Sequence, residues 1–87
     1  MFTPWIVIVV VTVHLAGGST QHKNVPVETK KYPLYEMCTK RMTMDAAFTV
    51  MKLNIIKLEL FGPQAEKITV KEVRCEKMRT IYREARK

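Results

Sequence analysis

Cys38 and Cys75 are the two residues whose type and number most readily suggest chemistry in this chain. The apolar N-terminus described below predicts export, and an even number of cysteines in an exported protein is typical of a disulfide. A bond closed within one chain would stabilise so small a fold by about 4 kcal/mol on the chain-entropy estimate, which is comparable with its net stability. We therefore predict that Cys38 and Cys75 form a disulfide, either within one chain or between two chains.

The remaining polar residues do not assemble into a catalytic or metal-binding set. Downstream of residue 18, the only serine is Ser19, the only histidine is His22 and the only aspartate is Asp45. A nucleophile and its base need fixed neighbours, and a metal site needs closely spaced ligands, whereas Ser19 and His22 lie in a polar stretch without periodicity. There is also no glycine-rich phosphate loop. We expect a non-enzymatic protein with no catalytic residues, no metal and no cofactor.

The first eighteen residues contain no charged side chain, and residues 5–16 read WIVIVVVTVHLA. This run has the length of the apolar core of a signal peptide and is short for a membrane-spanning helix. Small residues at Ala16, Gly17 and Gly18 suggest cleavage after Gly18, or next after Ser19. We predict that residues 1–18 are a signal peptide and that the protein is secreted and extracellular; the alternative is a retained membrane anchor.

Residues 19–31 are polar, lack periodicity and contain Pro26, so we predict a flexible arm there. Residues 32–87 would form a compact helical domain. Apolar residues at helical spacing predict a first helix, which Gly62 and Pro63 would end; these apolar residues are Leu34, Met37, Met44, Phe48, Met51, Ile55 and Leu58. Thr69 and Glu72 resemble a capping box that would begin a second helix.

The sequence therefore predicts an all-α fold, but a simple two-helix hairpin would place Cys38 about 27 Å from Cys75. Either the first helix breaks near Thr43, which gives a three-helix unit with one internal disulfide, or the bond joins two chains in a homodimer. A competing prediction is an α+β fold with a hairpin around Gly62 and Pro63. Its strands would be residues 56–60 and 67–71.

The formal net charge of +7 implies attraction to an anionic membrane, acidic glycans, nucleic acid or an acidic protein face and does not choose among them. For an exported chain we rank a protein receptor or an anionic membrane surface above nucleic acid, which we do not expect as a partner. The expected partner-binding basic face lies on the second helix and comprises Arg79, Arg83, Arg86 and Lys87. Five methionines, at positions 37, 42, 44, 51 and 78, suit core filling or, less commonly, a binding groove.

These features predict a small cationic peptide of the toxin, effector or host-defence type that binds a receptor, a channel or an anionic membrane. The chain resembles one-disulfide secretory peptides only in these general properties. Two alternatives are a single-pass subunit of a membrane complex and a peptide-hormone precursor. The precursor would be cut at the dibasic pairs Lys30-Lys31 and Lys40-Arg41.

Overall fold

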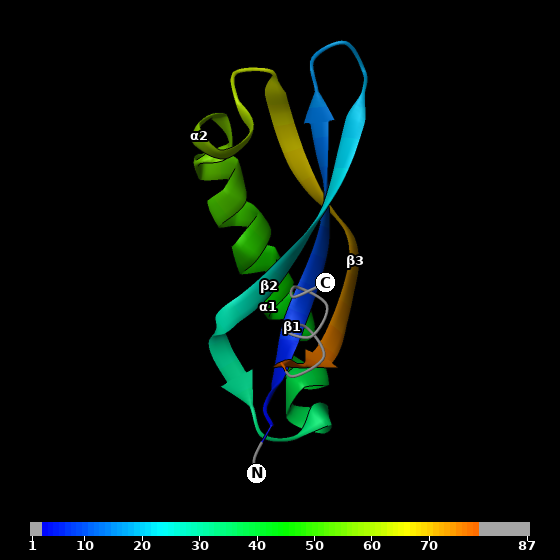
Figure 1. Ribbon diagram of the computed structural model, residues 1–87, viewed down its shortest axis with the longest axis vertical. Helices are drawn as coiled ribbons and strands as arrows, with labels where there is room; N and C mark the ends of the chain where they lie inside the picture. The colour runs from blue at the N-terminus through cyan, green and yellow to red at the C-terminus, as the bar shows by residue number, and fades with distance from the viewer. Residues whose placement is uncertain (1–2, 79–87) are drawn as a thin grey trace.

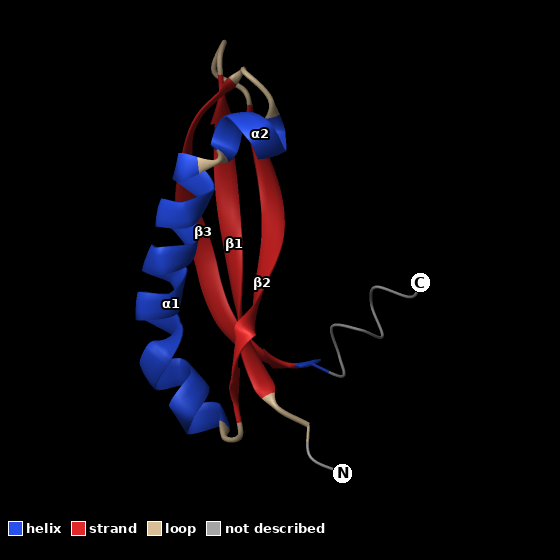
Figure 2. Ribbon diagram, turned by 90° about the vertical axis from the view of Figure 1, so that its left-hand side faces the viewer, coloured by secondary structure: helices blue, strands red, loops and turns tan. Residues whose placement is uncertain are grey.

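The computed structural model describes residues 3–78 and contains a three-stranded antiparallel sheet covered on one face by a helix (Figures 1 and 2). The elements follow in the order β1 (Trp5–Leu15), β2 (Thr20–Tyr32), α1 (Tyr35–Ile55), α2 (Lys57–Phe61) and β3 (Ala65–Lys77). The strand order is β2-β1-β3, so the first strand is the central one. The predicted all-α class is wrong, because strands occupy both ends of the described chain.

The apolar run that resembles a signal peptide is β1. Alternate side chains Val7, Val9, Val11 and Val13 face α1 and are completely buried. On the opposite face, Ile6 and Ile8 pack with Met78. The side chains of residues 6–11 are buried on both faces of the sheet, and such a strand reads as a continuous hydrophobic run. The many β-branched residues of β1 also favour a strand. Residues 5–15 therefore supply the centre of the sheet in this structure, whereas removal of residues 1–18 as a signal peptide stays a prediction.

The small residues after β1 form the turn into β2. Gly17 and Gly18 both have φ of 91°, a conformation that other residues rarely adopt. The Gly18 N–H donates to the Leu15 carbonyl, and the Leu15 N–H donates to the Ser19 carbonyl. The predicted flexible arm is mostly β2, which pairs with β1 along one edge only. An edge strand tolerates both its exposed polar side chains and Pro26.

The predicted first helix is present, but its break is not at Thr43. α1 runs from Tyr35 to Ile55, and a one-residue interruption at Ile56 separates it from α2. Gly62, with φ of 87°, follows α2 as the sequence suggests. The predicted hairpin around Gly62 and Pro63 is absent, because residues 57–61 are helical.

The predicted helix start at Thr69 is wrong, because Thr69 and Glu72 lie within β3. The part of that predicted helix beyond residue 78 lies outside the described residues. Opposite β1, Glu66 and Lys71 are extra residues that interrupt the pairing register. These two bulges place the α1-facing residues at spacings of three and two, which imitates a helical pattern; the α1-facing residues are Ala65, Ile68, Val70, Val73 and Cys75.

An extended β3 explains how the two cysteines meet. Asn54, near the end of α1, is hydrogen-bonded to Ile68 in β3, while Cys38 is bonded to Cys75. The helix covers about 24 Å between Cys38 and Asn54, and the strand covers about 23 Å between Ile68 and Cys75. A strand rises twice as far per residue as a helix, so the chain returns to Cys38 without the extra helix break that an all-α fold needs.

Candidate binding surface

The predicted disulfide is present and joins Cys38 in the first turns of α1 to Cys75 in β3 within one chain. The two Cα atoms are 6.2 Å apart, and Cys38 is completely buried. The alternative of an interchain bond between these cysteines is therefore wrong. The bond fixes the beginning of α1 against one edge strand of the sheet.

The predicted basic face, Arg79, Arg83, Arg86 and Lys87, lies outside the described residues. Within residues 3–78, we find no helix that combines the length and apolar character needed to cross a membrane. The same residues contain no group of three side chains suited to hold a metal ion.

Both histidines lie on the sheet face opposite α1, toward the β1–β2 turn. His14 shares a hydrogen bond of 3.0 Å with Thr69, and His22 shares one of 3.1 Å with Thr12. His22 was expected in a flexible arm but lies in β2, directly opposite Thr12. Each histidine is bonded to a threonine hydroxyl of a neighbouring strand, and these bonds connect the strands.

A buried carboxylate connects α1 to β2. Asp45 is 2 % exposed and accepts a hydrogen bond of 2.5 Å from the Tyr32 hydroxyl and one of 3.2 Å from the Lys30 ammonium. Burial of the phenol, and then its bond to Asp45, raises the pKa of Tyr32 above its ordinary value of 10. A buried charge needs such partners, so Asp45 has a structural role here.

Aromatic and cationic side chains gather where all three strands and α1 have an end, in what we call the aromatic–lysine cluster: Trp5, Tyr35 and Lys77. The Trp5 and Tyr35 rings meet edge to face with centroids 4.8 Å apart. The Lys77 ammonium lies 5.4 Å from the centroid of the Trp5 ring. Tyr35 is 52 % exposed and Lys77 is also exposed.

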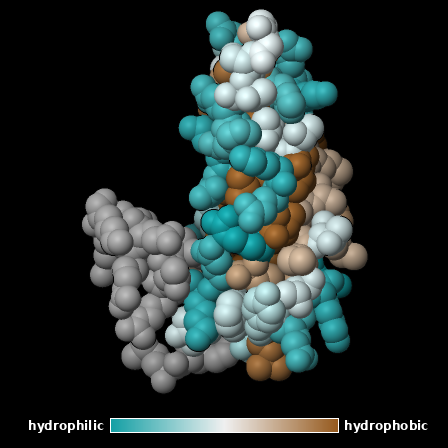
Figure 3. Space-filling model, turned by 90° about the vertical axis from the view of Figure 1, so that its right-hand side faces the viewer, coloured by the Kyte–Doolittle hydropathy of each residue, from teal (hydrophilic) through white to brown (hydrophobic). Residues whose placement is uncertain are grey.

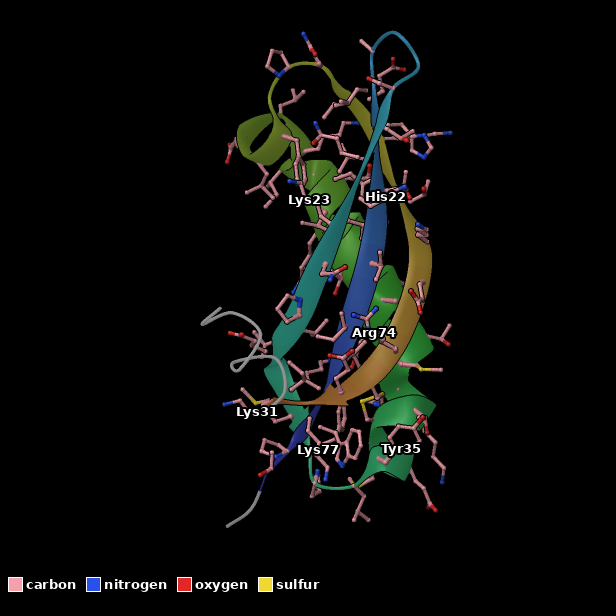
Figure 4. All side chains as sticks on the ribbon, turned by 45° about the vertical axis from the view of Figure 1, so that its right-hand side comes forward. His22, Lys23, Lys31, Tyr35, Arg74 and Lys77 are labelled. Atoms are coloured by element: carbon pink, nitrogen blue, oxygen red, sulfur yellow. A yellow bond between two sulfur atoms is a disulfide. The ribbon has the colours of Figure 1, made fainter. Side chains whose placement is uncertain are left out.

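The same end of the molecule carries a further lysine. Lys31 precedes Tyr32, which pairs with Trp5, and Trp5 pairs on its other side with Lys77. Figure 4 shows Lys31, Lys77 and Tyr35 together at the lower end, with His22 and Lys23 toward the upper end. Exposed aromatic rings beside cations are typical of binding anchors, because they combine apolar contact area with charge.

Glu72 and Glu76, two acidic residues in the second half of β3, are already paired. Arg74 forms ion pairs with Glu72 and Glu76, on the sheet face opposite α1. Within residues 3–78, neither Lys31 nor Lys77 forms an ion pair with an acidic side chain. The cluster was missed in the sequence because its members are distant along the chain.

The methionines divide between core and surface. Met78 is buried and Met42 is partly buried against the core, whereas Met37, Met44 and Met51 are exposed on α1. Figure 3 shows hydrophobic surface in the middle and on the right of the view, the side on which α1 lies, and hydrophilic surface on the left. Core filling therefore accounts for only part of the methionine set.

Comparison of the chain with family models, with curated proteins and with solved structures finds no match. The class of protein is consequently defined by the geometry. It is a small α+β protein with a helix bonded to its sheet by one disulfide and with an exposed aromatic and cationic end.

Proposed function

We propose that this protein is an extracellular, non-enzymatic binding protein of the toxin, effector or host-defence type. Its cationic surface would dock on a receptor, a channel or an anionic membrane. The observation that carries the proposal is the aromatic–lysine cluster, in which a half-exposed tyrosine and an exposed lysine adjoin a tryptophan. The net charge of +7 would raise the rate of encounter with an anionic surface.

The disulfide supports an extracellular location, since such bonds persist in oxidising compartments. Cleavage after Gly18, however, would remove Trp5 and the strand to which β2 and β3 both pair. A chain that begins at Ser19 therefore cannot have this sheet or this cluster. N-terminal sequencing of the natural protein tests whether β1 is retained. A chain that retains Trp5 supports the proposed surface, and a start at Ser19 or Thr20 contradicts it.

The precursor alternative meets a structural obstacle. Lys30-Lys31 lies in β2 and Lys40-Arg41 lies in α1, and Lys30 is bonded to Asp45. Cleavage at Lys40-Arg41 would need local unfolding of α1, and cleavage at Lys30-Lys31 would need Lys30 to leave its ion pair with the buried Asp45. We therefore favour the binding protein over the precursor.

Binding is tested with vesicles that contain phosphatidylserine and with neutral phosphatidylcholine vesicles. Lys31→Gln/Lys77→Gln should weaken binding to the anionic vesicles, and added salt should weaken binding of the unsubstituted chain. The matched control is Lys23→Gln/Lys67→Gln, which removes the same charge from exposed positions near the other end of the sheet. Equal loss in both double variants would show that net charge alone acts and that the cluster has no special role.

An acidic protein target is distinguished with immobilised polyglutamate. Retention on polyglutamate without vesicle binding, lost again in Lys31→Gln/Lys77→Gln, identifies a protein partner. Absence of binding to both probes contradicts the proposed function.

A further inference from the structure

The side of α1 that faces away from the sheet is apolar. On the inner side, Cys38, Asp45 and Ala46 are buried. The outer side carries large apolar side chains that are 44–76 % exposed, which we call the outer stripe: Met37, Met44, Phe48, Met51 and Ile55. α1 forms an outside layer of the molecule, and in Figure 2 the sheet lies only on its inner side.

The spacing of the outer stripe is that of a coiled-coil seam. Met37, Met44 and Met51 are seven residues apart and occupy the d positions of a heptad repeat. Phe48 and Ile55 occupy the a positions, with Arg41 as the one charged member. A narrow seam of this kind is suited to one facing helix, whereas a helix that lies in a membrane surface presents a broader apolar face.

We propose that the outer stripe binds a second copy of this chain, with the two α1 helices antiparallel. In this register, Met44 faces the partner's Phe48, Met37 faces the partner's Ile55, and Arg41 faces the partner's Met51. Each pair occurs twice because the arrangement has two-fold symmetry, so one stripe is complementary to itself. The inference is independent of the proposed anionic target, since the aromatic–lysine cluster is not part of this interface.

Charge selects the antiparallel arrangement. In a parallel pair, Arg41 would face the partner's Arg41 within an apolar seam, which is costly for two like charges. In the antiparallel pair, the aliphatic part of Arg41 covers a methionine, and its guanidinium remains beside the Tyr32 hydroxyl.

The flanks of the seam also permit close approach. Ala47 lies beside Met44 and Phe48 on one flank and comes opposite the partner's Ala47 across the two-fold axis, where small side chains let the helices pack. On the other flank, Asp45 is buried and already paired with Lys30 and Tyr32, so it brings no unpaired charge to the interface.

Sedimentation equilibrium of the oxidised full-length chain tests the proposal. The unsubstituted protein should form dimers whose fraction rises with concentration. Met44→Glu and Phe48→Lys should each weaken dimerisation at least about tenfold, because the introduced charge then faces an apolar side chain of the partner. Thr43→Glu is the matched control, since Thr43 is exposed beside the stripe and its substitution should leave the dimer unchanged.

The orientation is tested by mixing the two variants. In the antiparallel register, Glu at 44 in one chain faces Lys at 48 in the other, so an equimolar mixture of Met44→Glu and Phe48→Lys should dimerise again. In a parallel pair, the mixture instead sets Glu at 44 against the partner's Met44 and Lys at 48 against the partner's Phe48, so both charges face apolar side chains and dimerisation stays weak. Circular dichroism of each variant verifies that the fold is kept.

Three results overturn the proposal. They are a monomeric unsubstituted chain up to its solubility limit, a dimer indifferent to both substitutions, and a mixture that stays monomeric. A monomer whose binding to vesicles depends on Met44 and Phe48 would assign the stripe to a membrane instead.

Discussion

The side chain of Asn54 pairs with the backbone of Ile68 in both directions. Its carbonyl oxygen accepts the Ile68 N–H, and its amide donates to the Ile68 carbonyl, each at 2.9 Å. The same amide also donates to the carbonyl of Val50. Asn54 thus imitates a neighbouring strand at the edge of β3 and, together with the Cys38–Cys75 bond, fixes α1 to β3 at two points.

Replacing Asn54 should therefore destabilise the fold. Asn54→Ala leaves the partly buried N–H and carbonyl of Ile68 without their side-chain partners, which costs roughly 1–3 kcal/mol for each unsatisfied group. The free energy of unfolding, measured with urea, should fall accordingly. Asn24→Ala is the matched control, because Asn24 is exposed on β2, and an equal loss in the two variants would contradict a role for the Asn54 pairing.

The disulfide should contribute a large share of the net stability of so small a protein. Cys38 and Cys75 are separated by 37 positions in the sequence. A bond that closes such a loop lowers the conformational entropy of the unfolded chain and thereby stabilises the folded state by about 4 kcal/mol. Cys38→Ala/Cys75→Ala and the reduced native chain should both lose stability of that order in urea. Unchanged urea midpoints would show that the sheet holds α1 without the bond.

Tyr32 should make the stability sensitive to alkaline pH. Burial and the bond to Asp45 raise the pKa of the Tyr32 phenol in the folded protein, so folding favours the neutral, protonated phenol. The unfolded chain loses this proton near pH 10, and stability should therefore fall as the pH rises from about 10 to the higher folded pKa.

Tyr32→Phe isolates this effect, since it removes the titrating hydroxyl and keeps the ring. The variant should be less stable at neutral pH by roughly 1–3 kcal/mol, because Asp45 loses its closest donor. It should also show a smaller alkaline loss than the unsubstituted chain in parallel urea titrations. Identical pH dependence in the two proteins would exclude Tyr32 as the source.

Sequence reasoning found some of these features and missed others for identifiable reasons. The helix over residues 35–55 and the cysteine pair follow from local spacing and from the number of cysteines. β1 has the length and composition of a signal-peptide core, and only its high content of Val and Ile indicates a strand.

The two edge strands and the aromatic–lysine cluster were harder to predict. Bulges at Glu66 and Lys71 disguise β3 as a helical pattern, and β2 gives no amphipathic signal because most of its side chains face solvent. The aromatic–lysine cluster depends on the pairing of Trp5 with both Tyr32 and Lys77, which cannot be recognised before the sheet order is known.

Hydrogen–deuterium exchange on the full-length oxidised chain tests most directly whether β1 is the centre of this fold. Its backbone groups bond to strands on both sides and its side chains are the most buried, so the amides of residues 7–13 should exchange slowest of all. Rapid exchange across residues 7–13, with slow exchange confined to α1, would contradict this structure and favour a detachable leader ahead of a helical domain.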